Sequence, residues 1–102
     1  MSAEDHFNVG AEVWMDTNGV PASLISKDGT SKPVRAVLDR NSAEIGEYGV
    51  TVAIRPAIDF LVSEMPVIEQ GSEVQLPDGG SWILERQASN DGYIVRVWVE
   101  EK

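Results

Sequence analysis

The sequence predicts an all-β fold, a small single-domain β-barrel or sandwich of about seven short antiparallel strands with a mobile N-terminal arm and one long loop. Gly, commonly next to Asn or Asp, recurs about every ten residues between short apolar runs, a spacing typical of sandwiches and barrels. No stretch has the period of a long amphipathic helix. The length of 102 residues fits one domain. We divide it into an arm at 1–10 and a barrel-like domain at 11–102.

The first predicted hairpin follows the arm. Residues 11–17 alternate, with Ala11, Val13 and Met15 on one face, which is the period of a strand. The Asn-Gly pair at 18–19 is typical of a hairpin turn. Residues 20–27 then return as the second strand.

A long loop is predicted near the middle of the chain. After a short strand at 34–39, residues 40–49 break the alternation and contain two Gly and three charged residues. Long loops in compact domains are commonly functional or disordered. This loop carries Ile45 and Tyr48, two side chains suited to an interface.

The segment after the loop alternates strictly, which places Val50, Val52 and Ile54 on the inward face. Pro56 then interrupts the run. Because proline cannot donate to a β-ladder, we expect either a bend between two strands or a β-bulge there. Residues 57–63 follow as another alternating strand.

Residues 71–100 predict a three-stranded meander with Asp-Gly in both turns. In its last strand Tyr93 shares one face with three valines, and Ile94 shares the other with Arg96 and Trp98. Both faces are largely apolar. Either the strand is covered on both sides within the chain, or Ile94 and Trp98 reach a second subunit.

Composition and charge exclude several classes of protein. The net charge of −9 repels nucleic acid and anionic lipid, so we expect no direct nucleic-acid binding. No apolar run approaches the length of a membrane span, and the acidic first residues do not resemble a secretory signal. The chain has no Cys, which excludes disulfides and thiolate chemistry.

The sequence also lacks the residues of a catalytic or cofactor site. His6 is the single histidine and lies in the predicted arm, where it lacks the fixed partners of a general base or metal ligand. The acidic residues do not have the spacing of a calcium loop, and the glycines do not form a phosphate loop. We therefore predict no enzyme, no metal and no cofactor.

Five stretches carry a family resemblance: residues 36–39 (AVLD), 49–62, 71–76 (GSEVQL), 82–84 (WIL) and 91–100. In this order they resemble the head–tail joining (attachment) proteins of lambda-like tailed phages. The resemblance implies a seven-strand barrel or sandwich and a structural role in the virion. Several copies would form a ring that joins the DNA-filled head to the tail, assembled in the bacterial host cytoplasm.

The resemblance also implies which segments meet partners. In that family the arm and the long loop, here 1–10 and 39–49, are mobile in the free protein and become ordered on assembly. The expected partners are other phage head-completion and tail proteins and further copies of the chain. Whether the free protein is a monomer in solution stays open.

The residues expected to contact partners are Phe7 in the arm, Arg40, Asn41, Ile45, Glu47 and Tyr48 in the loop, and Ile94 and Trp98 in the last strand. The alternative function is a small β-barrel binding module that recognises a peptide or a sugar. Head–tail joining requires a virion connector but does not require such a module, and this observation distinguishes the two functions.

Overall fold

The structure, a computed structural model, describes residues 3–78 and 80–102, and at 3–9, 47 and 52 it describes the backbone only. Its elements in chain order are α1 (Ala3–Asn18), β1 (Val20–Ile25), β2 (Ser31–Ile45), the short 3-10 helix η1 (Glu47–Gly49), β3 (Thr51–Leu61), β4 (Glu73–Leu76), β5 (Gly80–Asn90) and β6 (Ile94–Glu101).

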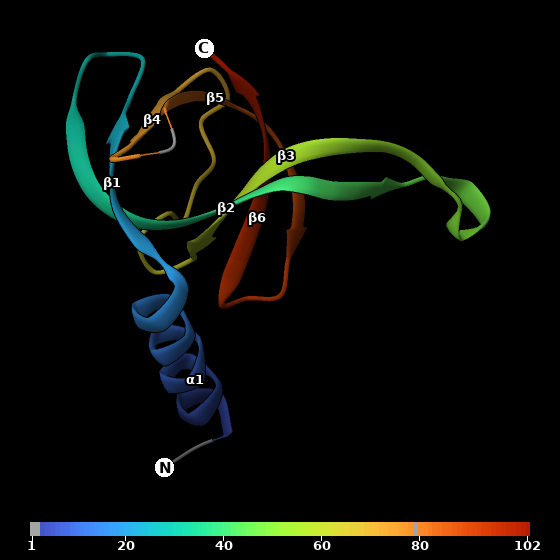
Figure 1. Cartoon of the computed structure of the whole chain (residues 1–102). Helices are drawn as coiled ribbons and strands as arrows, with labels where there is room; N and C mark the ends of the chain where they lie inside the picture. The colour runs from blue at the N-terminus through green and yellow to red at the C-terminus, as the bar shows by residue number, and fades with distance from the viewer. Residues whose placement is uncertain (1–2, 79) are drawn as a thin grey trace.

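The strands form a closed antiparallel barrel in the order β1-β2-β3-β6-β5-β4. β4 pairs with β1, which closes the sheet on itself and leaves the barrel wall without an open edge. Figure 1 shows this barrel, with α1 on one side and a long β2–β3 hairpin on another. The predicted all-β class and the terminal meander, β4–β5–β6, are confirmed. The described residues contain six strands instead of seven.

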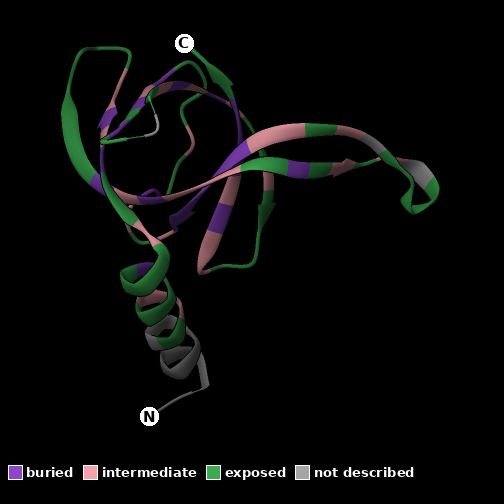
Figure 2. Cartoon of the chain, viewed as in Figure 1, coloured by how far each residue is buried: buried purple, intermediate pink, exposed green. Residues whose placement is uncertain are grey.

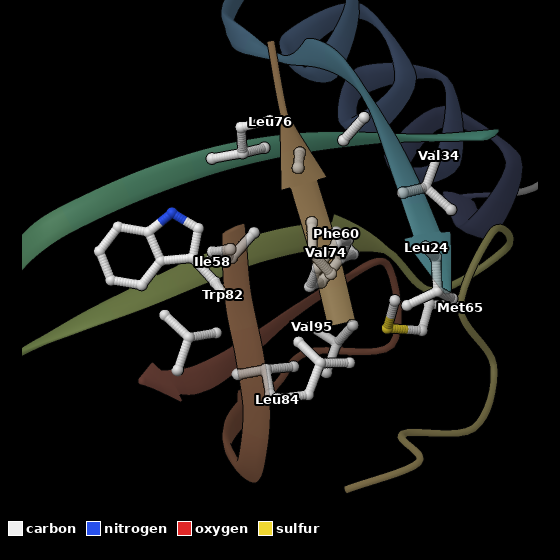
Figure 3. Close-up of a cluster of buried hydrophobic side chains, with 14 residues drawn as sticks. Leu24, Val34, Ile58, Phe60, Met65, Val74, Leu76, Trp82, Leu84 and Val95 are labelled. Atoms are coloured by element: carbon white, nitrogen blue, oxygen red, sulfur yellow. The ribbon is translucent and has the colours of Figure 1, made fainter. Parts of the chain in front are cut away.

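The barrel is filled by apolar side chains from all its strands, as Figure 3 shows. Ile58 and Phe60 of β3 and Val97 of β6 are fully buried. Trp82 of β5 lies at one end of this cluster and is 2% exposed. Burying large apolar groups of this kind contributes about 1.5–3 kcal/mol per side chain, so this core is the main source of stability.

The segment predicted as an N-terminal arm and a first strand is a helix. α1 runs from Ala3 to Asn18, through residue 10, where we placed the boundary of the arm. Gly19 follows its last residue, and the N–H of Gly19 donates to the carbonyl of Met15 at 2.7 Å. The strand prediction was wrong because Asn-Gly is common after helices as well as in hairpin turns. Alternation over so few residues did not separate the two structures.

Helix α1 is fixed to the barrel at its C-terminal end. Met15 is completely buried there. Arg35 of β2 forms ion pairs with Asp16, with Glu12 at 3.8 Å, and with Glu64 in the β3–β4 connection at 2.8 Å. One guanidinium thus joins the helix, the barrel and a loop.

Most of the predicted long loop is strand. β2 continues to Ile45 and pairs with β3, so that only η1 and its neighbours form a turn. The predicted bulge exists, but it lies in β2: the register shifts between Asp39 and Ser42, opposite Pro56. β3 itself is continuous through Pro56, so the alternative of a bend between two strands was wrong. The bulge interrupts the alternation of inward and outward side chains in β2. The sequence pattern therefore does not predict a strand there.

Candidate partner-binding site

The β2–β3 hairpin extends well beyond the barrel. β1 pairs with β2 only as far as Ala36, and β6 pairs with β3 only from Ala57. Within the described ladder, residues 42–55 therefore pair with each other alone. We call these residues the arm; they are distinct from the predicted N-terminal arm at 1–10, which α1 occupies from Ala3. Figure 2 shows that exposed and intermediate residues make up most of its length.

The two faces of the arm differ in polarity. Residues directly opposite in an antiparallel pair share a face. Ser42 pairs with Arg55 on one face, whereas Ala43 pairs with Ile54 on the other. The first face is polar and turned toward β5 and β6, because Ser42 accepts a hydrogen bond from Arg96 of β6 at 2.9 Å. The second face is apolar and lies in solvent.

The exposed apolar face continues the core face of the barrel. Successive side chains of a strand alternate between faces, so Ile54 lies on the same face of β3 as Ile58 and Phe60. Ile58 and Phe60 are fully buried, but Ile54 is 60% exposed. Val50 at the tip is 61% exposed. The prediction that Val50 and Ile54 point into a core was therefore wrong, and Val52 lies outside the described side chains.

The arm ends in a strained tip. The N–H of Gly46 donates to the carbonyl of Val50 at 2.8 Å and closes the turn. Tyr48 has a φ of 63° and is 97% exposed. A bulky residue in the left-handed region costs about 1–2 kcal/mol, and such strain is common at functional positions. The tip therefore presents an aromatic ring to solvent at an energetic cost.

A hollow of about 650 Å³ lies where the apolar face meets the end of the barrel, and its lining includes Ile54, Pro56, Trp82 and Val99. The guanidinium of Arg40 lies 5.3 Å from the centre of the Trp82 ring. The apolar face meets this hollow at Ile54, and we name the face, the tip and the hollow together the docking surface.

The residues predicted to bind partners divide between this surface and the rest of the chain. Tyr48 lies on it at the tip and is 97% exposed, whereas Ile45 is 57% exposed but lines a hollow on the polar face with Ser42 and Glu44. Arg40 and Asn41 form the bulge at its base and are exposed. Val50 and Ile54 also lie on this surface, although their strict alternation with polar residues predicts buried positions.

The other four predicted residues lie outside the docking surface or have side chains that the structure does not describe. The structure describes no side chain for Phe7 or Glu47. Ile94 is half-buried on β6. The sequence left open whether Trp98 is buried within the chain or by a second subunit. In the structure Trp98 is 5% exposed, so it is buried within the chain.

A second exposed apolar surface lies on α1. Val13 is 58% exposed and Trp14 is 39% exposed. This surface was missed, since the segment was predicted as a strand. Figure 1 shows α1 and the arm leaving the barrel in different directions.

The described side chains contain no group of three or more His, Cys, Asp or Glu that could hold a metal ion. Among the described helices, none is both long and apolar enough to cross a membrane. The docking surface carries exposed apolar side chains, such as Val50 and Ile54, beside charged ones, such as Arg40.

Comparison with known proteins identifies the family. The family model described as Phage Head-Tail Attachment protein matches residues 4–100. No curated protein matches the chain. The family match covers α1, the barrel and the arm together, so it includes every element that builds the docking surface. The chain belongs to the phage head–tail attachment protein family.

Proposed function

We propose that this protein is a non-catalytic joint between the DNA-filled head and the tail of a phage virion, and that its arm docks onto neighbouring proteins of that junction. The family match supports the joining role. The arm supports the mode of action, because it carries apolar side chains that the rest of the described chain leaves uncovered.

One observation carries the proposal. Ile54 has the sequence pattern of a core residue, on the same face of β3 as Ile58 and Phe60, but it is 60% exposed. Exposed apolar surface costs free energy in water and commonly marks a protein interface. A partner that covers this face extends the core of the barrel outward along the arm.

Several copies form a ring in this proposal. A ring needs two different surfaces on each copy, one for each neighbour. The arm and the Val13–Trp14 surface of α1 are two such surfaces, and they lie on different sides of the barrel. The other faces of the ring meet head-completion and tail proteins in the virion, after assembly in the host cytoplasm.

The net charge of −9 fits this order of events. Copies of like charge repel each other at long range, which keeps a protein with exposed apolar surface from associating before a docking site appears. Binding to a completed head then supplies the contacts that outweigh this repulsion. The acidity thus favours assembly on the particle over assembly in free solution.

The proposal is tested by adding the purified protein to a mixture of free tails and heads that lack it, and counting joined particles by electron microscopy. Joined particles with ring-shaped density at the junction are expected. Joining that proceeds equally well without the protein would contradict the proposal and favour the alternative of a peptide- or sugar-binding module. For such a module, Trp82 is a poor platform, since it is 2% exposed.

A further inference from the structure

Both long edges of the arm are open. β1 pairs with β2 only as far as Ala36 and β6 pairs with β3 only from Ala57, so among the described strands residues 42–45 and 51–55 form ladder pairs only with each other. In Figure 1 none of the other described elements runs alongside the outer half of the arm. Every second residue of an antiparallel strand turns its backbone N–H and C=O away from its partner. The arm therefore presents one row of backbone donors and acceptors along β2 and another along β3.

These edges lack the usual protection of an edge strand. Lysine, proline and bulges commonly prevent such a strand from pairing with another chain. Residues 42–55 contain no lysine and no proline. Pro56 and the bulge opposite it lie at the base of the arm, and the other register shift, between Glu44 and Ile45, lies next to the tip. The stretch between them is open to a further strand on either side.

The β3 edge is also a part of this acidic chain that carries little charge. Residues 48–54 (YGVTVAI) contain no charged residue, although the net charge of the chain is −9. Four of these seven residues are Val, Ile or Thr, which are typical of strands. Short segments of high β-propensity and low charge are those that add to other strands. Copies of like charge meet the least repulsion along such an edge.

A second copy of the chain fits both edges at once. In a ring every arm has the same sense, so the β3 edge of one copy lies beside the β2 edge of the next. β2 and β3 are antiparallel within one arm, and these two edges are consequently antiparallel between copies as well. The edges also have similar lengths, at 42–45 and 51–55. A strand from an unrelated protein would fill one edge and leave the other open.

The alternation of side chains favours the same partner. Ala43 of β2 and Ile54 of β3 lie opposite each other on the exposed apolar face of the arm. A register that brings Ile54 of one copy to the same face as Ala43 of the next continues this apolar face across the boundary. A slip by one residue would instead set apolar against polar side chains. Paired arms therefore join the apolar faces of neighbouring copies into one band.

We propose that the arms of neighbouring copies pair edge to edge, with the backbone of β3 in one copy hydrogen-bonded to the backbone of β2 in the next. The contact is heterologous, as a ring requires. A two-stranded ribbon is only marginally stable in water, so each arm gains stability from the strands that the neighbouring copies add. The proposal rests on the ring of the proposed function and identifies how its copies join. The edges bind the next copy, and the apolar face stays open to head and tail proteins.

The chain has no Cys, so single cysteines report which strands meet between copies. One preparation carries Ala43→Cys on β2, and a second carries Val50→Cys, Val52→Cys or Ile54→Cys, which scan the register in steps of two. The two are mixed at high salt, which screens the repulsion between acidic copies, and are oxidised mildly. Facing positions on adjacent strands have Cβ atoms about 4.5–5.5 Å apart, near the distance of a disulfide. The same position in the next copy lies two strands away, at roughly 9–10 Å.

At least one mixture is expected to form disulfide dimers several-fold faster than either of its components alone. Ala53→Cys mixed with Ala43→Cys is the matched control, because Ala53 is next to Ile54 but on the other face of β3. Val67→Cys mixed with Ala43→Cys measures random collision, since Val67 is exposed and lies in the β3–β4 connection. The edge contact is overturned if no mixture exceeds both controls, in free solution or in joined particles, or if a single variant dimerises as fast as the mixture.

The joining assay separates this contact from the proposed function. Heads that lack the protein and free tails are joined with the same mixtures, and the joined particles are expected to contain the same disulfide. If the parent chain joins heads to tails but the mixtures never exceed their controls, the edge contact is wrong and the joining role stands. If dimers form in free solution but the parent chain does not join heads to tails, the contact stands and the proposed function is wrong.

Discussion

Arg96 of β6 binds the carboxylate of Asp59 on β3 with two parallel hydrogen bonds, from Nε to Oδ1 at 2.7 Å and from Nη2 to Oδ2 at 2.9 Å. Asp59 is 6% exposed and lies directly opposite Arg96 in the β3–β6 ladder. The same guanidinium reaches Ser42 at the base of the arm. This pair therefore joins the barrel wall to the arm where β3 leaves the barrel.

Removing Arg96 is expected to destabilise the protein strongly. Arg96→Ala leaves the buried Asp59 carboxylate without its cation, a change that costs about 3 kcal/mol. The free energy of unfolding in urea measures it. Arg40→Ala, at an exposed arginine without a described carboxylate partner, should cost about 1 kcal/mol or less.

The double variant isolates the cause. Asp59→Asn removes the buried charge, so combined with Arg96→Ala it should be more stable than Arg96→Ala alone. A double variant that is no more stable than the single one would show that the ion pair is not the reason for the loss.

Alanine at Gly10 and alanine at Gly19 are expected to change the free energy of unfolding in opposite directions. A Cβ on Gly19 would lie 2.5 Å from the carbonyl oxygen of Met15, which is buried and cannot move away. Gly19→Ala should cost about 1–3 kcal/mol. A Cβ on Gly10 meets none of the described atoms within 4 Å, and Gly10→Ala in a helix should stabilise by about 0.5–1 kcal/mol. Thermal unfolding of both variants checks the difference in sign, and equal signs would refute the described end of α1.

Strain at the tip predicts a gain in stability with a loss of function. Tyr48→Gly removes the cost of a positive φ and should stabilise by about 1 kcal/mol, although it deletes the exposed ring. Tyr48→Ala deletes the ring but keeps the strain. Both variants should join heads to tails more slowly, and only the glycine variant should unfold at higher urea. If Tyr48→Gly is no more stable than Tyr48→Ala, the backbone of the tip is not strained.

Acid should destabilise the fold through carboxylates whose pKa is lowered. The N–H groups of Ile94 and Tyr93 donate to Asp91 in the β5–β6 turn and hold its pKa below the ordinary 3.8. The side chains of Lys102 and Gln75 hold the pKa of Glu73 below 4.5. Because the folded pKa is the lower one, the unfolded chain binds more protons in acid. The stabilisation that these two carboxylates supply is complete above about pH 4.5 and is lost as the pH falls through their folded pKa values.

Asp91→Asn checks the sign of that effect. The variant should be less stable than the parent at neutral pH, since an amide oxygen is a weaker acceptor than a carboxylate. The two free energies of unfolding should converge as the pH drops below 3.8. Curves that stay parallel down to that pH would show that Asp91 does not contribute through its charge.

The sequence predicted the terminal meander because its turn residues and its alternation agree. Asp91 and Gly92 form a turn, and the alternating valines of β6 line the core. It did not predict α1, because the apolar spacing around Met15 fits both structures. Met15 lies four residues after Ala11, a spacing that shares a face in a helix, and two residues after Val13, a spacing that shares a face in a strand. Tertiary burial of Met15 decides between them, and local pattern does not contain that information.

The docking surface could be predicted only in part, for a different reason. Alternation tells which face of β3 Ile54 occupies, but it does not tell where the barrel ends. Ile45 and Tyr48 were identified as interface residues because they are apolar or aromatic in a segment without a strand signal. Beside Trp98, Arg86 of β5 forms an ion pair with Glu44 of the arm. These two residues are more than 40 positions apart, and a single sequence does not reveal such a contact.

The central claim is that the apolar face of the arm docks at the head–tail junction, and one comparison of variants tests it most directly. Ile54→Asp places a charge on that face, and Val67→Asp places the same charge on an exposed apolar residue of the β3–β4 connection, away from the arm. Both variants should fold, because both side chains are mostly exposed. In the head–tail joining assay Ile54→Asp should lose most of the activity and Val67→Asp should retain it. Equal activity of the two variants would contradict the account.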